Sequence, residues 1–395
     1  MDNNTPLAQR VHIGFFGIRN AGKSSLVNAF TNQSMSVVSD VLGTTTDPVR
    51  KTMELLPLGP VVIIDTAGID DNGEVGLMRV KVTEKILRKC HIAVLVTEAG
   101  REFNADENRL VKCFKERNLP FIIAKNKADL VENTDENSEN TVYVSAKNGK
   151  GIDELKNAIA NIKLPENKNY YLSDLIGRGD FVLLVMPIDG SAPKGRIIMP
   201  QQMAVREILD AGAVSIAVQP DEIENALAGL AKKPSLAVTD SQVFSQVNKV
   251  LPNDIPLTSF SILMARYKGF LKTAVQGAKM IDKLKNGAKI LISEGCTHHR
   301  QCGDIGRDKL PVWLENYTKK KFDFQWTSGA DFPENLTAFD LIIHCGGCML
   351  DDKEMQFRRN EAENQGVPFT NYGTAIAHIN SILERSIAPV LEINV

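Results

Sequence analysis

The chain has 395 residues, which is too long for one ordinary hydrophobic core and predicts two or three domains. Its formal net charge is −2, which argues against a basic nucleic-acid-binding surface that dominates the protein, although a local basic patch stays possible. No run approaches about 18 consecutive apolar residues and the first residues lack the pattern of a signal peptide, so we expect a cytoplasmic protein without a membrane span.

The first part of the chain alternates strands with helices. Strands are predicted at residues 11–17, 61–64, 92–96, 121–124 and 142–144. Helices are predicted at 23–30 and 152–162, and helical patterns fall between most of the strands. This alternation indicates a parallel sheet covered on both faces. The polar, proline-broken stretch 164–169 reads as a linker, so the first domain is placed at residues 1–168.

A second α/β domain is expected at residues 169–262. Its strands are predicted at 181–188, 214–218, 236–239 and 256–259, and its helices at 201–209, 221–231 and 241–250. Few reactive side chains occur here, apart from Lys194 and Arg196 in a Gly/Pro turn. We find no internal repeat and no low-complexity tract in the sequence.

The third domain, residues 263–395, begins with one long helical run at 262–284. Strands follow at 289–293, 322–326, 341–343 and 368–370, and helices at 353–365 and 374–385. Two of these strands lead directly into cysteines, Cys296 and Cys345. In open parallel sheets ligands bind beyond the carboxyl ends of the strands. The predicted fold class is therefore α/β, with a P-loop domain followed by two further α/β domains with mainly parallel sheets.

A phosphate-binding loop lies between the first strand and the first helix. The sequence there is Gly17-Ile18-Arg19-Asn20-Ala21-Gly22-Lys23-Ser24, which matches G-x-x-x-x-G-K-[ST]. Its glycines let backbone N–H groups surround phosphates, Lys23 reaches the β and γ phosphates, and Ser24 binds Mg²⁺. The helix N-terminus adds a dipole that favours anions. This loop alone is compatible with ATPases as well as GTPases.

Later segments of the chain indicate that the bound base is guanine rather than adenine. Asn126-Lys127-Ala128-Asp129 resembles the N-K-x-D motif of the GTPase superfamily, in which the carboxylate accepts hydrogen bonds from N1–H and N2 of guanine. Adenine has no such pair of donors. Ser145-Ala146-Lys147 resembles the motif behind the base, and Asp65-Thr66-Ala67-Gly68 resembles the metal-facing part of switch II. Gly43-Thr44-Thr45-Thr46-Asp47 resembles switch I, with Thr45 favoured as the Mg²⁺ contact and Thr44 and Thr46 as rivals.

The predicted nucleotide-binding residues all belong to these motifs. They are Gly17, Asn20, Ala21, Gly22, Lys23, Ser24, Ser25, Thr45, Asp65, Gly68, Asn126, Lys127, Asp129, Ser145, Ala146 and Lys147. The predicted Mg²⁺ ligands are Ser24, Thr45 and Asp65, and the predicted catalytic residues are Lys23, Thr45, Gly68 and Glu74.

Two residues suggest how hydrolysis proceeds. Ile69 stands where Ras-like enzymes have a water-orienting glutamine. Asn20 occupies the position used for K⁺ in TrmE, Era and related GTPases, where the ion takes the place of an arginine finger. We therefore expect a slow GTPase that K⁺ accelerates. Glu74 is either the residue that positions the water or a solvated loop carboxylate.

Four of the six cysteines lie in the last hundred residues: Cys296, Cys302, Cys345 and Cys348. In a reducing compartment such clustering indicates metal or redox chemistry rather than disulfides. A structural zinc site on three cysteines and His298, a redox dithiol, an Fe–S cluster and metal-free thiols all remain open. Gly346-Gly347 permits close backbone approach and N–H donors to sulfide, which favours a cluster over zinc.

The combined pattern Cys296-x-His298…His344-Cys345-x-x-Cys348, behind a TrmE/Era-like GTPase domain, resembles the HydF family of [FeFe]-hydrogenase maturation GTPases. The resemblance spans the whole chain. It implies a GTP-binding domain, a dimerisation domain and a [4Fe-4S] cluster held by the three cysteines. The fourth ligand stays open among His298, His344, Cys302, Asp304 and an exogenous group.

The resemblance also implies partners and cofactors. The expected cofactors are GTP, Mg²⁺, K⁺ and the [4Fe-4S] cluster, and the expected partners are radical-SAM maturases and apo-[FeFe]-hydrogenase, with no nucleic acid and no membrane. A diiron precursor would be received and delivered by a homodimer or higher homo-oligomer. Two other hypotheses remain: a ribosome- or tRNA-associated Era/TrmE-type GTPase with a structural zinc, and a cluster-sensing switch without delivery. The basic run at 319–321 is the one feature comparable with an Era-type RNA-binding region.

Overall fold

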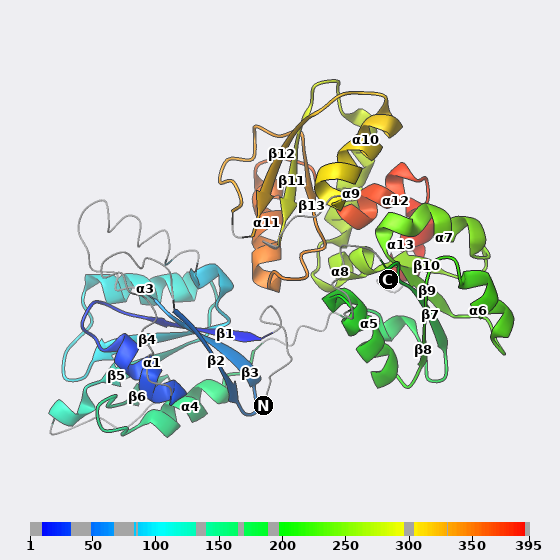
Figure 1. Cartoon of the computed structure of the whole chain (residues 1–395). Helices are drawn as coiled ribbons and strands as arrows, with labels where there is room; N and C mark the ends of the chain where they lie inside the picture. Colours follow the sequence, from blue (N-terminus) through cyan, green and yellow to red (C-terminus); the bar gives the residue numbers. More distant parts are fainter. Residues whose placement is uncertain are drawn as a thin grey trace. The chain divides into compact units, whose positions relative to one another are not determined.

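The structure is a computed structural model that describes residues 10–32, 49–66, 83, 86–131, 140–164, 170–188, 197–295, 304–329 and 331–391. The chain divides into two compact units, Met1–Glu166 and Asn167–Val395 (Figure 1). No helix in the described part of the chain combines the length and apolarity that a membrane span requires.

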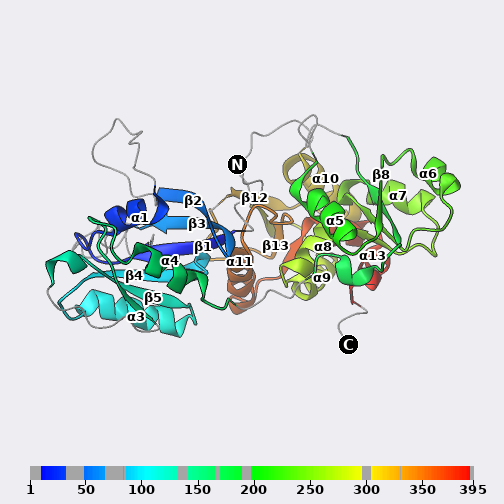
Figure 2. The same cartoon turned by 90° about the horizontal axis from the view of Figure 1, so that it is seen from below.

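The first unit is a six-stranded sheet in the order β2-β3-β1-β4-β5-β6. Its strands are β1 (Val11–Phe16), β2 (Val49–Leu55), β3 (Gly59–Asp65), β4 (Ile92–Glu98), β5 (Phe121–Asn126) and β6 (Thr141–Tyr143). Its helices are α1 (Lys23–Thr31), α3 (Ala105–Glu116) and α4 (Ile152–Ala160). Figure 2 shows α1 and α3 on opposite sides of the sheet, which confirms the expected coverage of both faces.

Edge strand β2 was missed from the sequence. It runs antiparallel to β3, whereas the other strand pairs of this sheet are parallel. Its side chains alternate between exposed and half-buried until the buried Leu55, and it carries charges at Arg50, Lys51 and Glu54. An edge strand covered on one side only lacks the continuous apolar run by which the central strands were found.

The second unit contains two four-stranded sheets, in the orders β10-β9-β7-β8 and β12-β11-β13-β14. The first sheet consists of β7 (Phe181–Val185), β8 (Val214–Val218), β9 (Leu236–Thr239) and β10 (Leu257–Ser259). The second consists of β11 (Lys289–Glu294), β12 (Asp323–Ser328), β13 (Leu341–His344) and β14 (Phe369–Asn371). The helices are α5 (Met199–Asp210), α6 (Ile223–Gly229), α7 (Phe244–Val250), α8 (Phe260–Tyr267), α9 (Leu271–Lys279), α10 (Leu310–Thr318), α11 (Asp352–Asn364), α12 (Tyr372–Ile379) and α13 (Leu383–Leu391). Every described strand pair in both sheets is parallel.

These two sheets are repeats of one fold. Each places its four strands in the spatial order second, first, third, fourth. Their registers also correspond, since the pair Val185–Thr239 in the first sheet has its equivalent in the pair Ser293–His344 in the second. We call β7 to α9 the first repeat and β11 to α13 the second repeat. The sequence itself shows no internal repeat, because the correspondence lies in strand order and register.

The repeats exchange their last helices. Helix α9 of the first repeat lies against β14 of the second, so closely that a Cβ on Gly277 would approach Phe369 O to 2.1 Å. Thr370 Oγ1 also donates to Ala274 O at 2.7 Å. Reciprocally, α13 of the second repeat lies against β10 of the first. One hydrophobic core therefore runs through both repeats.

Two long helices expected from the sequence are each broken in two. The run 262–284 forms α8 and α9, with Gly269 in the left-handed region between them at φ 75°. The helix expected at 374–385 forms parts of α12 and α13, with Ser381 between them at φ 57°. A left-handed residue ends each first helix and turns the chain toward the other repeat. The expected domain boundary at 262/263 consequently falls inside α8.

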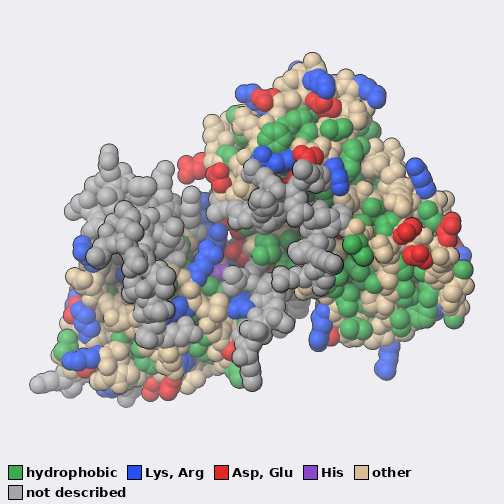
Figure 3. Space-filling view, viewed as in Figure 1, with side chains coloured by type: hydrophobic (Ala, Val, Ile, Leu, Met, Phe, Trp, Pro, Cys, Tyr) green, Lys and Arg blue, Asp and Glu red, His purple; other side chains and the backbone are tan. Residues whose placement is uncertain are grey.

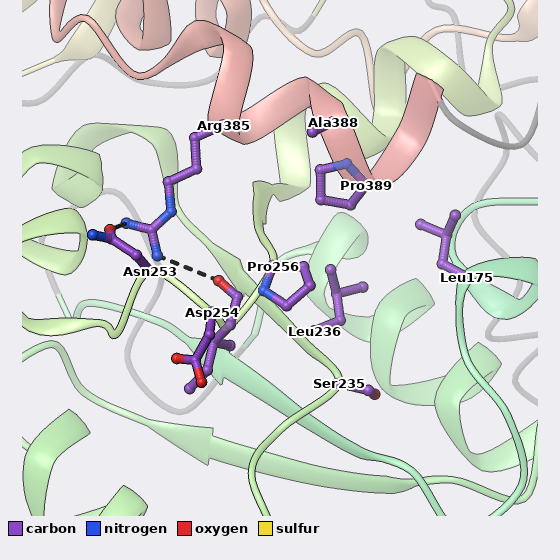
Figure 4. A pocket seen from close by; sticks show the side chains of 10 residues that line it. Leu175, Ser235, Leu236, Asn253, Asp254, Pro256, Arg385, Ala388 and Pro389 are labelled. Atoms are coloured by element: carbon purple, nitrogen blue, oxygen red, sulfur yellow. Dashed lines mark hydrogen bonds between the residues drawn. The ribbon is translucent and has the colours of Figure 1, made fainter.

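Arg385 joins α13 to the first repeat beside a shallow pocket at the amino ends of β9 and β10 (Figure 4). Its guanidinium donates to Asn248 Oδ1 and Pro252 O, each at 2.7 Å.

We expect Arg385→Leu to lower the free energy of unfolding of the second unit by about 1–3 kcal/mol, because these acceptors lose their donors. Urea unfolding measures the change. Unchanged nucleotide affinity of the first unit is the control, and a wild-type midpoint would show that the joint adds no stability.

Candidate functional site

The nucleotide motifs converge at the carboxyl edge of the first sheet. The phosphate-binding loop follows β1, and Asn126 ends β5. Asn126 Nδ2 donates to Ala21 O at 2.9 Å, and its Oδ1 accepts from the N–H of Ala146 at 3.1 Å. A Cβ on Gly22, which has φ 83°, would approach Asn126 Nδ2 to 2.3 Å. Asn126 therefore ties the phosphate loop to the motif behind the base, and only glycine fits at position 22.

Asp65, Ser24 and Lys23 meet beneath this loop. Burial raises the pKa of the Asp65 carboxyl, whereas a hydrogen bond from Ser24 and the charge of Lys23 act in the opposite direction. Asp65 Oδ1 is buried and has no hydrogen-bond partner among the described residues. A buried carboxylate oxygen without a partner, next to a P-loop serine, fits the hydration shell of Mg²⁺. These residues would hold the ion against the β and γ phosphates.

Asp129 belongs to the segment that was predicted to bind the guanine base. Its carboxylate accepts from Ser145 Oγ at 2.6 Å, and this bond lowers the pKa of Asp129. The side chain is exposed and therefore accessible to a ligand. Lys127, in the left-handed region at φ 61°, forms an ion pair with Glu98 at 3.1 Å. The carboxylate is thus ionised and held in place, as acceptance of two guanine N–H groups requires.

Several predicted site residues lie outside the described residues. They are Thr45, Gly68 and Glu74 of the nucleotide site, and Cys296, His298 and Cys302 of the cysteine site. Asn20 is described, exposed and in the left-handed region at φ 64°. Ser25 and Lys147 are described near the loop and the base motif, where Lys147 lowers the pKa of Asp129.

Cys345 and Cys348 lie directly beyond the carboxyl end of β13. Both thiols are free and half-buried. Cys345 Sγ accepts from the N–H of Gly295 at 3.1 Å and from that of Gly347 at 3.3 Å. Gly295 directly follows β11 and directly precedes Cys296 in the sequence. Burial raises the pKa of the Cys345 thiol to about 11, which makes a metal-free thiolate unfavourable.

The donor set fits a soft metal. Two thiols separated by two residues, with backbone N–H groups directed at one sulfur, are the chemistry of an Fe–S site or a zinc site. Among the described residues no three His, Cys, Asp or Glu side chains gather in ligating positions. Cys296, the third predicted thiol ligand, lies outside the described residues.

The first repeat contacts the segment that follows β13, residues 345–350, which we call the cysteine turn. Lys268, which follows α8 and is buried, donates from Nζ to Leu350 O at 2.6 Å and to Asp352 Oδ1 at 3.1 Å. Its charge also opposes the effect of burial, which raises the pKa of Cys348. The sequence did not single out Lys268, because nothing local shows that α8 reaches across to the other repeat.

His344 and Asp304, two candidate fourth ligands, already have partners. His344 is fully buried, with Nδ1 at 2.8 Å from Cys345 O and Nε2 at 3.1 Å from Arg358 Nη1. Burial and the charge of Arg358 lower the pKa of His344 to about 3, so the ring is neutral. Asp304 Oδ1 accepts from the N–H of Arg307 at 2.9 Å.

Arg358 was also missed, although a signal for it exists in the sequence. Met355, Arg358 and Ala362 are spaced by three and four residues and share the buried face of α11. An arginine on an apolar helical face indicates a buried polar partner.

Two family models match most of the second unit. Residues 171–269 match the family model described as hydrogen maturase F dimerization domain, and residues 272–389 match the hydrogen maturase F tetramerization domain. The chain belongs to the hydrogen maturase F family. Residues 12–127 match the model of the 50S ribosome-binding GTPase, so this hydrogen maturase F chain carries a GTPase domain. The two hydrogen maturase F segments meet at the turn between α8 and α9.

Curated relatives resemble part of this chain. The tRNA modification GTPase MnmE of Endomicrobium trichonymphae is 34% identical over 184 residues, which cover 44% of this chain and 40% of that protein. GTPase Der of Wolinella succinogenes is 35% identical over 173 residues, covering 40% and 36% respectively. The chain thus spans less than half of the length of these relatives. Among solved structures, Era of Aquifex aeolicus aligns with a TM-score of 0.32 and 18% identity, covering 53% of this chain and 92% of that one.

Proposed function

We propose that this member of the hydrogen maturase F family is a GTP-dependent scaffold that holds a [4Fe-4S] cluster and delivers a diiron precursor to apo-[FeFe]-hydrogenase. The observation that carries the proposal is the cysteine turn. Cys345 Sγ receives two backbone N–H groups, one of them from Gly295 directly before Cys296. Such N–H groups stabilise the charge of cluster-bound sulfur.

In this proposal Cys296, Cys345 and Cys348 hold the cluster. With three protein thiolates, the cluster supplies one iron that an exchangeable group can bind. His298 and Cys302, which lie outside the described residues, are candidates for that position, as is an exogenous ligand. Asp304 is a weaker candidate, because its Oδ1 already accepts from the Arg307 N–H. On the side of Gly295 and Gly347 the Cys345 sulfur is held by the chain's own backbone, since both N–H groups are bonded to it.

GTP would act as a switch on partner binding rather than on the cluster itself. In this scheme Lys23, Ser24 and Asp65 hold the phosphates and Mg²⁺, while Thr45 and Gly68 are ordered by the γ-phosphate. Glu74 positions the attacking water. In this proposal residues 1–168 bind GTP, residues 169–262 mediate dimerisation and residues 263–395 hold the cluster. Helix α8 spans the boundary between the last two segments.

Anaerobic reconstitution tests the cluster and the delivery separately. Protein that binds about four irons and four sulfides, is then loaded by the radical-SAM maturases and finally activates apo-hydrogenase supports the full proposal. Colourless protein with one zinc would contradict the cluster. A complete cluster without activation of apo-hydrogenase would contradict the delivery role and favour the hypothesis of a cluster-sensing switch.

Potassium dependence tests the proposed role of Asn20. We expect wild-type GTP turnover to be about tenfold or more faster in K⁺ than in Na⁺, because a cation beside the phosphates neutralises developing charge. Asn20→Ala should show equal rates in both salts. Asn118→Ala is the matched control, since Asn118 is a second left-handed asparagine of the first unit, at φ 49°, outside the nucleotide motifs. Equal wild-type rates in Na⁺ and K⁺ would refute the potassium site.

Self-association is part of the proposal. The second unit exposes large apolar side chains, among them Ile188 at 81%, Leu209 at 59% and Val214 at 43% exposure. Figure 3 shows hydrophobic side chains among charged ones over the surface of this unit. Stronger support comes from the matches of residues 171–269 and 272–389 to family models of a dimerization and a tetramerization domain. Light scattering of the full chain should therefore give a dimer or a higher oligomer, and a monomer at micromolar concentration would contradict it.

A further inference from the structure

We propose that His344 is a positioning residue and not an iron ligand: Arg358 orients its ring, and the ring fixes the backbone of the cysteine turn. This inference rests on the proposed function, because it assigns a role within the same site.

Arg358 is the centre of a buried network. It has no exposed surface and projects from α11 toward the ends of three strands. Its guanidinium reaches four acceptors: Glu354 Oε1 at 2.9 Å, Ser293 Oγ at 3.3 Å, His344 Nε2 at 3.1 Å and Gly329 O at 2.6 Å. These acceptors lie on α11, at the ends of β11 and β13, and directly after β12.

The chemistry of the two partners assigns the hydrogens of His344. A guanidinium can only donate, so Nε2 of His344 accepts from Arg358. A carbonyl can only accept, so Nδ1 carries the hydrogen that it donates to Cys345 O at 2.8 Å. Neither nitrogen therefore has a lone pair for iron. Turning the ring toward a metal would leave a fully buried guanidinium without one of its acceptors.

The network holds Cys345 from two sides. His344 Nδ1 fixes the carbonyl of Cys345, and Ser293 O accepts from the N–H of Cys345 at 2.9 Å. Ser293 is itself bonded to Arg358 through Oγ. The peptide groups on both sides of the Cys345 Cα are thus fixed relative to β11, which leads to Cys296.

The first repeat provides an internal comparison. Equivalent registers place Val185 where the second repeat has Ser293, and Thr239 where it has His344. Thr239 Oγ1 bonds to Val185 O at 3.4 Å, and no buried arginine or histidine occurs among the described residues of this repeat. The same sheet therefore forms without such a network. Among the described residues, a buried arginine bonded to a histidine occurs only in the repeat that carries the cysteines, which points to the site rather than the fold as its reason.

The test compares substitutions that keep or remove the hydrogen bonds. His344→Gln can donate and accept once each, whereas His344→Leu and Arg358→Met cannot. We expect His344→Gln to bind iron and sulfide like the wild type, with an unchanged electron paramagnetic resonance spectrum of the reduced cluster. His344→Leu and Arg358→Met should lose iron to a chelator about tenfold faster or more, as expected for residues behind a metal ligand. Thr239→Val, at the equivalent position of the first repeat, is the control and should match the wild type.

Two results would overturn the inference. One is a strong nitrogen hyperfine coupling in the wild-type cluster that disappears in His344→Gln, since a directly ligating ring nitrogen couples more strongly than the backbone N–H groups bonded to sulfur. The other is wild-type iron loss from Arg358→Met. Should either apolar variant fail to fold by circular dichroism, Arg358→Lys keeps the charge and is expected to show intermediate iron loss, with a wild-type rate again contradicting the role. A wild-type protein without any cluster would instead refute the proposed function.

Discussion

Cys345→Ser is expected to retain less than about a tenth of the iron that the wild-type protein binds after anaerobic reconstitution. A serine hydroxyl does not ionise to a ligand at neutral pH, whereas a thiolate does so readily once a metal binds. The substitution also leaves the N–H groups of Gly295 and Gly347, which now reach Cys345 Sγ at 3.1 and 3.3 Å, without their sulfur acceptor. Iron and sulfide assays together with the visible spectrum measure the result.

Cys113→Ser is the matched control for this loss. Cys113 is a free, half-buried thiol on α3 of the first unit, so it has similar exposure but lies in the GTPase domain. Iron content should stay at the wild-type value in Cys113→Ser, and nucleotide affinity should stay unchanged in Cys345→Ser. A wild-type iron content in Cys345→Ser would show that Cys345 is not a cluster ligand.

Asp129→Asn is expected to weaken GDP binding by about 100-fold or more and to raise the affinity for xanthosine diphosphate. The carboxylate offers acceptors to N1–H and the exocyclic amine of guanine, and asparagine replaces one acceptor by a donor. Xanthine carries an oxygen in place of that amine, so the new donor meets an acceptor. Equilibrium binding of fluorescent nucleotides measures both changes.

Two further variants make this experiment specific. Ser145→Ala removes the hydroxyl that donates to Asp129 at 2.6 Å, so it should weaken GDP binding by only about three- to tenfold, the equivalent of one hydrogen bond. Asp153→Asn alters an exposed carboxylate in the first turn of α4 and should have no effect. Equal affinity of Asp129→Asn for both diphosphates would show that another group recognises the base.

The GTPase domain was largely predictable from the sequence because its signals are local. Buried parallel strands appear as continuous apolar runs, and β1, β4 and β5 were located within a few residues. Each motif follows such a strand directly, so its place at the sheet edge follows from the order of elements. Asn126 shows the limit, since its bonds to Ala21 and Ala146 join segments about a hundred and twenty residues apart along the chain.

The second unit was less predictable where helix ends decide the topology. Residues 262–284 have the periodicity of one helix, yet the chain reverses at Gly269 and α9 crosses to β14. Periodicity reports which face is apolar, but not which sheet covers that face. The shared topology of the two sheets is not visible in the sequence either. Strand order and register depend on which strands pair, and not on the identity of the side chains.

By itself, the sequence determined the chemistry that short segments carry: a phosphate loop, a guanine-binding carboxylate and a pair of cysteines beyond a strand. Only the tertiary structure showed the partners of His344, Arg358 and Lys268. A histidine beside a cysteine reads as a metal ligand until its partners are known, and here Arg358 and the Cys345 carbonyl occupy both ring nitrogens. Lys268 reaches the cysteine turn from the other repeat. The physical reason is that a donor or a charge acquires its function from the groups that bury it, and those groups come from distant parts of the chain.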